Sequence, residues 1–149
     1  MESWLLPYLG AVRRIEDFQA LDIKGMLRAL LPWPLPLELE RMAPERWAVP
    51  SGSSVAIDYT QDPPVLAVKL QEMFGCEETP TIADGRVALL IHLLSPGQHP
   101  LQITQDLAGF WRSGYQDVKR EMKGRYPKHP WPEDPWTATP THRAKPRVR

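Results

Sequence analysis

Proline interrupts this sequence so often that long helices and strands fit in only a few places. The 149 residues include 17 prolines, and the densest stretch is GRYPKHPWPEDPW, residues 124–136. Proline removes a backbone donor and fixes φ, so this stretch forms neither a helix nor a central strand. Its four prolines nevertheless alternate with large aromatic rings, those of Tyr126, Trp131 and Trp136. Such a segment is a loose end, a ligand-binding strip or a strap that closes a core.

We predict that residues 124–136 are a structural strap, which Trp131 and Trp136 hold against apolar surface. Burial of one such ring contributes about 2–3 kcal/mol, and the prolines lower the entropy cost of ordering the segment. The alternative is that an aromatic-lined groove of another protein binds the proline-rich segment. The segment lacks a regular proline repeat, which favours the strap.

The first 45 residues are predicted to be helical, because their apolar residues recur at helical spacing. The segments with this pattern are 4–12, 15–31 and 37–44. Asp22 is a candidate N-cap within the second segment. The pattern then alternates, which indicates a β-hairpin of Arg46–Val49 with Ser54–Tyr59 around a Pro-Ser-Gly-Ser turn.

Residues 65–74 fit two kinds of element. Their apolar side chains fit the 3.6-residue period of a helix and also, in part, the two-residue period of a strand. The Asp-Pro-Pro sequence before the segment and Gly75 after it favour the helix. Residues 86–96, RVALLIHLLSP, form a continuous apolar run, which indicates a strand buried on both faces. Residues 101–104 return after a turn as the next strand.

The longest predicted helix covers residues 105–124, with Thr104 as its N-cap and Gly124 at its C-terminus. Its core-facing stripe steps by four, four, three and four residues along Leu107, Trp111, Tyr115, Val118 and Met122. Gly109 and Gly114 are expected to let another segment approach the helix closely.

Together these segments predict an α+β fold. It has N-terminal helices, a small mostly antiparallel sheet, one long C-terminal helix, and then an extended Pro/Trp strap and a basic tail. We expect one compact domain over residues 1–136, made of a helical lead-in (1–45), sheet and helices (46–123) and the strap (124–136). Residues 137–149 are expected to form a flexible basic tail.

Several classes of site find no support in the sequence. Cys76 is the one cysteine, so no disulfide framework forms and a reducing, cytoplasmic compartment is expected. We expect its thiol to be inert, because the acids Glu77 and Glu78 raise a thiol pKa. The four histidines lack metal-ligand spacing, and we interpret His92 as a hydrogen-bonded core residue. We find no phosphate-binding loop, and we assign this chain no catalytic residue, metal or cofactor. We also find no apolar run of membrane length and no signal peptide.

The charge of the chain is unevenly distributed, although lysine plus arginine equals aspartate plus glutamate at 18 each. From residue 118 onward nine bases face three acids, so a basic end follows an acidic body. A basic end fits nucleic acid, and it fits equally a tail that lies on its own acidic body. The residues predicted to contact nucleic acid, as phosphate-binding cations or base-stacking rings, are Arg112, Lys119, Arg120, Lys123, Arg125, Tyr126, Lys128, His129, Arg143, Lys145, Arg147 and Arg149. The alternative for the helix is an ordinary solvated face, with Asp117 and Glu121 as partners one turn away.

The greater part of the chain resembles a known family. The block LAVKLQEMFG, continuing through TPTIADGRVALLIHLLSPGQHPLQITQDLAGFWRSGYQDVKREMKGRYPKHPWPEDP, looks like the C-terminal region of the HrpB family of bacterial ATP-dependent helicases of the DEAH/RHA type. The upstream segments SWLLPYLGAVRR and VPSGSSVAIDY also resemble that region, and FWRSGYQDVKREMKGRYPKHPWPEDP is the most specific part. The resemblance implies a fragment of a helicase whose motor domains bind ATP and Mg²⁺. No residue of those sites has a counterpart here.

Two functions remain open at this point. In the first, the chain is a non-motor accessory domain, which packs on the motor domains of its own protein and extends their surface for RNA or single-stranded nucleic acid. In the second, it is a protein-interaction or scaffolding module, in which the Trp-Pro strap and the basic tail dock a partner or the helicase core. In neither is the fragment expected to be an enzyme by itself.

Overall fold

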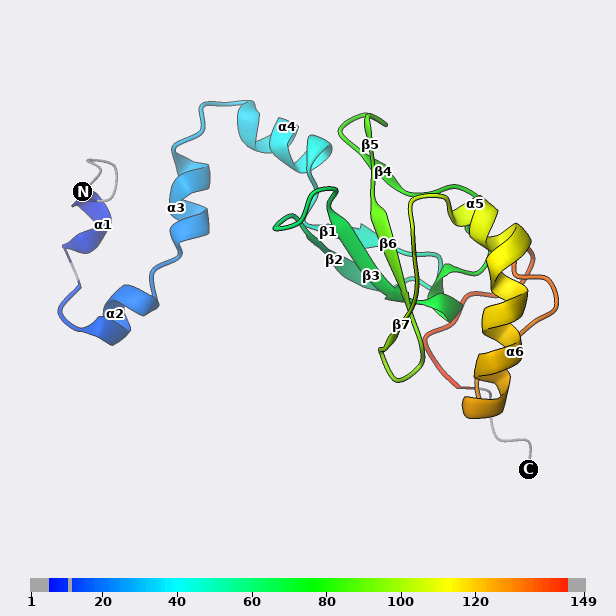
Figure 1. Cartoon of the computed structure of the whole chain (residues 1–149). Coiled ribbons are helices and arrows are strands. Elements are labelled where there is room, and N and C mark those ends of the chain that lie inside the picture. The colour runs from blue at the N-terminus through cyan, green and yellow to red at the C-terminus, as the bar shows by residue number, and fades with distance from the viewer. Residues whose placement is uncertain (1–5, 11, 145–149) are drawn as a thin grey trace. The chain divides into compact units, whose positions relative to one another are not determined.

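The computed structural model describes residues 6–10 and 12–144, which fall into two compact units, Met1–Arg41 and Met42–Arg149 (Figure 1). The division lies close to residue 45, where the helical lead-in was expected to end. The lead-in forms a unit of its own, however, whereas one compact domain was expected over residues 1–136.

The N-terminal unit consists of short helices that bury very little surface. The helices are α1 (Leu6–Leu9), α2 (Ile15–Gln19), α3 (Ile23–Ala29) and α4 (Leu35–Met42). The Asp22 carboxylate accepts a hydrogen bond from the Gly25 N–H at 3.0 Å, which confirms Asp22 as an N-cap. Among the described residues of this unit, only Met26 is buried. The described part of this unit therefore contributes no cluster of buried apolar side chains.

The C-terminal unit is built on a five-stranded sheet in the order β1-β2-β3-β6-β7. The strands are β1 (Arg46–Ala48), β2 (Ser54–Asp58), β3 (Val65–Lys69), β6 (Leu90–Leu94) and β7 (Pro100–Thr104), with β4 (Thr81–Ile82) and β5 (Val87–Ala88) as a separate pair. Neighbouring strands are antiparallel except β3 and β6, which run parallel with Leu66 opposite Ile91. The predicted α+β class and the mostly antiparallel sheet, with its β1–β2 hairpin, are confirmed.

Residues 65–74 form a strand followed by a 3-10 helix, so the favoured prediction of an α-helix is wrong. Val65–Lys69 pairs with a strand on each side as β3, and η1 (Leu70–Met73) follows as one 3-10 turn. Three of the five β3 side chains are buried, as expected of a strand between two partners. The turn adds Leu70 and Met73 to the core, which explains the helical period.

The apolar run at residues 86–96 is shared by β5 and β6, and β6 is buried on one face, not on both. Ile91 and Leu93 are buried, whereas Leu90, His92 and Leu94 are half-buried. The cause is the two-residue alternation of a strand, which turns successive side chains to opposite faces. His92 therefore lies on the less buried face, and the prediction that it is a core residue is wrong.

One long helix covers residues 107–125 and contains a π-helical turn. Its parts are α5 (Leu107–Gly109), the π-helical η2 (Phe110–Gly114) and α6 (Tyr115–Arg125). The N-cap is Asp106 and not Thr104, because the Asp106 carboxylate accepts a hydrogen bond from the Gly109 N–H at 2.9 Å. The helix also continues through Gly124, so its predicted glycine end is wrong by one residue.

Gly109 and Gly114 make room for side chains of their own helix and not for another segment, contrary to prediction. A Cβ atom at Gly109 would overlap the carboxylate of the Asp106 cap. A Cβ atom at Gly114 would lie 2.8 Å from the ring of Phe110. The two glycines therefore serve the start of the helix and the packing of its first aromatic ring.

The long helix lies beside the sheet (Figure 1). Its predicted stripe and the buried side chains of the sheet belong to one hydrophobic cluster. The buried members of the stripe are Leu107, Trp111, Tyr115 and Met122, and Val118 packs beside them half-buried. Trp111 and Tyr115 meet the rings of Phe74 and Phe110 with centroids 5.2 to 6.5 Å apart. The predicted core face of the helix is confirmed.

Candidate nucleic-acid interface

Residues 124–136 are held against the sheet-helix core by packing and hydrogen bonds. The Trp131 side chain is 6% exposed, and its indole N–H donates a hydrogen bond to the Tyr126 carbonyl at 2.9 Å. The Tyr115 hydroxyl donates to the Pro132 carbonyl at 2.7 Å, inside the core. Trp136 packs half-buried against the same core. These contacts are those of a strap that is attached to the core of its own unit.

The path of the chain stays fixed beyond the strap. The Gly75 N–H donates to the Pro135 carbonyl at 2.9 Å, and the Thr141 N–H donates to the Gln71 carbonyl at 3.0 Å. Ala138 packs against the core between these two bonds. The attached segment thus extends past residue 137, where the tail was expected to begin. Of the predicted tail cations, Arg143 is exposed, and Lys145, Arg147 and Arg149 lie outside the described residues.

Lys119 is a structural residue and not an exposed phosphate contact, which corrects its predicted place on the basic face. It is 7% exposed, and its ammonium pairs with the Glu133 carboxylate of the strap. The Gln116 amide donates to the Glu133 carbonyl at 3.2 Å beside this pair. The hydrogen bond from Lys119 holds the pKa of Glu133 below its usual range. Glu133 of the strap therefore neutralises the buried ammonium group of Lys119.

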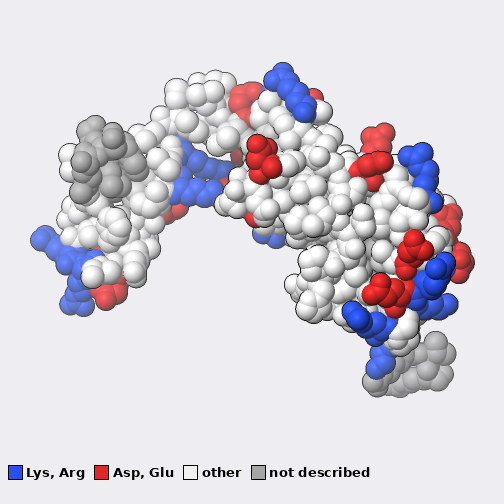
Figure 2. Space-filling model, viewed as in Figure 1, with Lys and Arg blue, Asp and Glu red and all other residues white. Residues whose placement is uncertain are grey.

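The exposed side of the long helix carries both signs of charge. Arg120 lies 3.6 Å from Asp117 with both side chains about four-fifths exposed, and the Arg112 guanidinium donates to the Ala108 carbonyl at 3.3 Å. Figure 2 shows acidic and basic side chains interleaved over α5 and α6. An interleaved surface of this kind offers a polyanion little net attraction. Arg112 and Arg120 are thus less favourable contacts than their position in the sequence indicated.

A more uniform basic surface lies at the C-terminal end of α6. We name it the basic corner and define it as Lys69, Arg125, Tyr126, Lys128 and His129. Arg125 and Lys128 are exposed, and Tyr126 and His129 are half-buried with ring centroids 6.2 Å apart. Lys69 lies at the end of β3, opposite Leu94 of β6. Burial, and then the charge of Lys69, lower the pKa of His129. Sequence reasoning missed Lys69, because an isolated lysine in an apolar segment carries no local signal.

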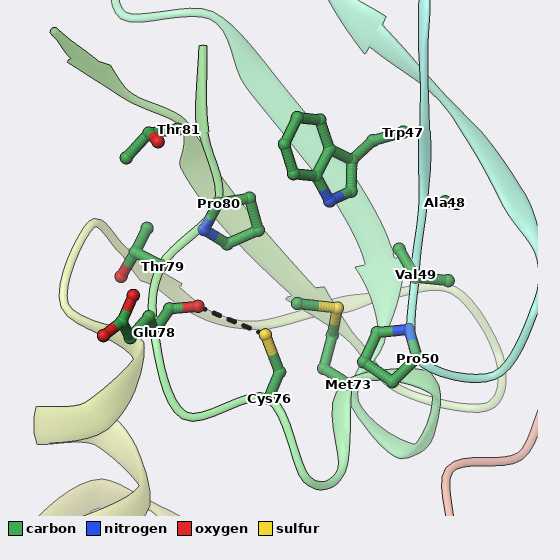
Figure 3. A pocket seen from close by; sticks show the side chains of 10 residues that line it. All are labelled: Trp47, Ala48, Val49, Pro50, Met73, Cys76, Glu78, Thr79, Pro80 and Thr81. Atoms are coloured by element: carbon green, nitrogen blue, oxygen red, sulfur yellow. Dashed lines mark hydrogen bonds between the residues drawn. The ribbon is translucent and has the colours of Figure 1, made fainter. Parts of the chain in front are cut away.

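A pocket of about 410 Å³ lies between β1 and the loop at residues 76–81 (Figure 3). Trp47, Pro50, Met73 and Pro80 line it with apolar surface. The Cys76 thiol donates to the Glu78 carbonyl at 3.2 Å, and burial raises the pKa of this thiol. A raised pKa of the Cys76 thiol was predicted, although its main cause is burial and not the neighbouring acids.

Other classes of site are not found in the described part of the chain. Across residues 6–10 and 12–144, His, Cys, Asp and Glu side chains form no group of three or more that could hold a metal ion. Within the same ranges, no helix has the length and apolar character needed to cross a membrane.

Comparison with known proteins places this geometry in one family. Residues 4–135 match the family model of the HrpB ATP-dependent helicase C-terminal region. The ATP-dependent RNA helicase HrpB of Escherichia coli (strain K12) is 51% identical over 146 residues, which are 97% of this chain and 18% of the relative.

Solved structures show the same similarity. The crystal structure of the E. coli DExH-box NTPase HrpB aligns with a TM-score of 0.84 at 51% identity, over 95% of this chain and 18% of that chain. A crystal structure of the Escherichia coli DEAH/RHA helicase HrpB aligns with a TM-score of 0.66 at 50% identity, over 87% of this chain and 16% of that chain. This chain spans less than a fifth of the relatives it matches. Family model, sequence and fold agree, and the chain belongs to the HrpB family of ATP-dependent helicases as a C-terminal region.

Proposed function

We propose that this chain is a non-motor accessory domain of an ATP-dependent helicase, which packs on the motor domains and extends their surface for nucleic acid. The E. coli relative is named an ATP-dependent RNA helicase, and more than four-fifths of its length lies outside the matched region. ATP hydrolysis is assigned to that remainder, because a phosphate-binding glycine loop is not found in the present sequence.

The apolar surface of the N-terminal unit carries this proposal. Ile15, Trp33 and Leu37 are 73%, 76% and 54% exposed, and further leucines of α3 and α4 are between two-fifths and three-fifths exposed. Soluble domains seldom leave so many large apolar side chains uncovered over so few residues. In a helicase of this family, the motor domains of the same protein are the surface that would bury these side chains.

The nucleic-acid part of the proposal rests on the surplus of cations toward the C-terminus. Nine bases face three acids from residue 118 onward. Of those that lie within residues 118–144, Lys119 is buried and forms an ion pair with Glu133 of the strap. The exposed cations that remain can displace counterions from phosphates, which makes binding depend strongly on salt.

The deciding experiment compares the complete helicase with a version that lacks this region, in RNA-stimulated ATPase, unwinding and RNA-affinity assays. We expect RNA affinity and unwinding to fall on removal, and the 149-residue chain alone to hydrolyse no ATP. Unchanged RNA affinity and unwinding would show the proposal to be wrong.

The packing part has its own test, co-elution of the 149-residue chain with the motor fragment. We expect the double variant Ile15→Asp, Leu37→Asp to lose co-elution, because it places charges on the apolar surface of the N-terminal unit. The matched control is Ile103→Asp in β7, whose side chain is 51% exposed in the other unit. Equal losses in both variants would contradict docking through the N-terminal helices.

A second candidate function is the docking of a protein partner. The observation in its favour is the apolar pocket beside Trp47, which has room for a large side chain of another protein (Figure 3). The strap does not support this candidate, since Trp131 is buried in its own unit. A partner whose binding is lost in Trp47→Ala, with RNA affinity unchanged, would favour the second function over the first.

A further inference from the structure

Three segments that are far apart in the sequence meet at the C-terminal end of α6. They are the end of β3 at Lys69, the β6–β7 turn at Gly97, and residues 125–129. Lys69 lies opposite Leu94, the last residue of β6 before this turn, which joins the first segment to the second. The Tyr126 hydroxyl lies against Gly97, which joins the second segment to the third. The basic corner is thus assembled by the fold and is not a run of charge along the chain.

The charge of these three segments has one sign. Residues 65–71, 93–104 and 125–132 contain no aspartate or glutamate. Their lysines and arginines are Lys69, Arg125 and Lys128. Among the described residues, the side chains of Arg125 and Lys128 form no ion pair, in contrast to Lys119 and Arg120 on the same helix. Like charges gathered in this way repel one another until an anion lies between them.

We propose that the basic corner binds the phosphate backbone of single-stranded RNA. The inference rests on the proposed function, because it assigns the nucleic-acid surface of the accessory domain to one place. It moves that surface away from the exposed face of α6 and adds Lys69, which no sequence pattern indicated. It commits Arg125 and Lys128 to phosphate contacts, and Tyr126 and His129 to contacts with unpaired bases.

The rings of the corner favour a single strand over a duplex. Tyr126 and His129 lie nearly perpendicular, at 86°, and both are half-buried, so each ring has one part packed and one part accessible. An unpaired base can stack on such a ring, and this contact is tolerant of sequence. Bases inside a duplex are already stacked and cannot reach it. Cations beside rings therefore suit a single strand.

Gly97 keeps the Tyr126 ring in place. A Cβ atom at Gly97 would lie 2.7 Å from the Tyr126 hydroxyl oxygen, closer than such atoms approach. The Tyr126 carbonyl meanwhile accepts hydrogen bonds from the Trp131 indole and from the His129 N–H, at 2.9 and 3.1 Å. Backbone and ring of Tyr126 are thus both fixed before any ligand arrives, which lowers the entropy cost of binding.

The test is a fluorescence titration of the 149-residue chain with labelled oligo(U) of about 12 nucleotides, at about 50 and about 200 mM salt. The corner variant is Arg125→Glu, Lys128→Glu. We expect its affinity to fall at least about tenfold at the lower salt, and its salt slope to fall by about 1.4, for two lost phosphate contacts on a single strand.

The matched control is Arg112→Glu, Arg120→Glu, which makes the same change of net charge on the same helix outside the corner. We expect less than about a threefold loss of affinity, because these arginines lie on a surface of mixed charge. Equal losses in the two double variants would show that binding follows net charge alone and would overturn the inference. Thermal melting checks that both variants fold, and Arg125→Gln, Lys128→Gln gives the same comparison without introducing acids.

The outcomes separate this inference from the proposed function. If the unmodified chain binds oligo(U) and the corner variant binds equally well, the corner is wrong and the accessory role stands. If the unmodified chain does not bind at the lower salt, the nucleic-acid part of the proposed function fails together with the corner. If duplex RNA of the same length binds as tightly as oligo(U), and Tyr126→Leu has no effect on either, the single-strand assignment is overturned.

Discussion

Trp131 is the side chain that fastens the strap. Its ring is 6% exposed within the core, and its N–H has a backbone partner. We expect Trp131→Ala to lower the free energy of unfolding by about 3–5 kcal/mol, because it leaves a cavity and removes the hydrogen bond from the indole N–H. Urea denaturation of the 149-residue chain measures this. Trp33→Ala is the control, because Trp33 is 76% exposed and its loss should change stability by less than about 0.5 kcal/mol. Similar losses in both variants would contradict the assigned strap.

Gly124 and Gly97 both lie next to residues of the basic corner, and their substitution by alanine should change stability in opposite directions. Gly124 lies inside α6 and a Cβ atom there meets nothing within 4 Å, so Gly124→Ala should stabilise the chain by about 0.5–1 kcal/mol through helix propensity. Gly97→Ala should instead destabilise it, because the added Cβ atom displaces the Tyr126 hydroxyl. Thermal melting of both variants measures the difference. A stabilising Gly97→Ala would show that Tyr126 is not held by the turn.

The helix and the strap are joined by an ion pair that makes their attachment depend on pH. The hydrogen bond from Lys119 holds the pKa of Glu133 below its ordinary value of 4.5. A carboxyl group whose pKa is lowered on folding stabilises the fold fully above its unfolded pKa, and this contribution is lost as pH falls through the folded pKa. Glu133→Gln should therefore lower the melting temperature at neutral pH, where it leaves the Lys119 ammonium buried without its partner.

The difference between Glu133→Gln and the unmodified chain should shrink as pH falls from about 7 to about 3. Asp117→Asn is the control, because the Asp117–Arg120 pair is exposed and should contribute little at any pH. Melting curves across this range measure both variants. A Glu133→Gln effect that stays constant with pH would show that the carboxylate charge does not hold the strap.

At the scale of the whole molecule, the two units should differ in their ability to fold alone. Every member of the hydrophobic core lies between Val49 and Trp131, within the C-terminal unit. We expect residues 42–149 to keep the near-ultraviolet circular dichroism of the Trp111 and Tyr115 cluster after removal of residues 1–41. The separate N-terminal peptide should be largely unfolded, since among its described residues only Met26 is buried. Loss of the aromatic signal on truncation would show that the units depend on each other.

Prediction from sequence succeeded where short-range pattern decides the structure. The stripe from Leu107 to Met122 and the β1–β2 hairpin follow from periods of a few residues, and both were found. It failed at residues 65–74, where ten residues satisfy two periods at once and the choice depends on hydrogen-bond partners elsewhere in the chain. It also failed for Gly109, because a glycine signals that space is needed without indicating which atoms fill it.

The candidate site, too, could be predicted from the sequence only in part. The sequence by itself determined the α+β class, the helical stripe, the extended strap and the excess of base toward the C-terminus, because each depends on residue types and their local spacing. Only the tertiary structure decided which cations are exposed. The strap returns Glu133 to Lys119, fourteen positions away, and β3 brings Lys69 to His129, sixty positions away. Charge acts through space, so the sequence order of these residues does not reveal which of them compensate one another and which assemble a basic surface.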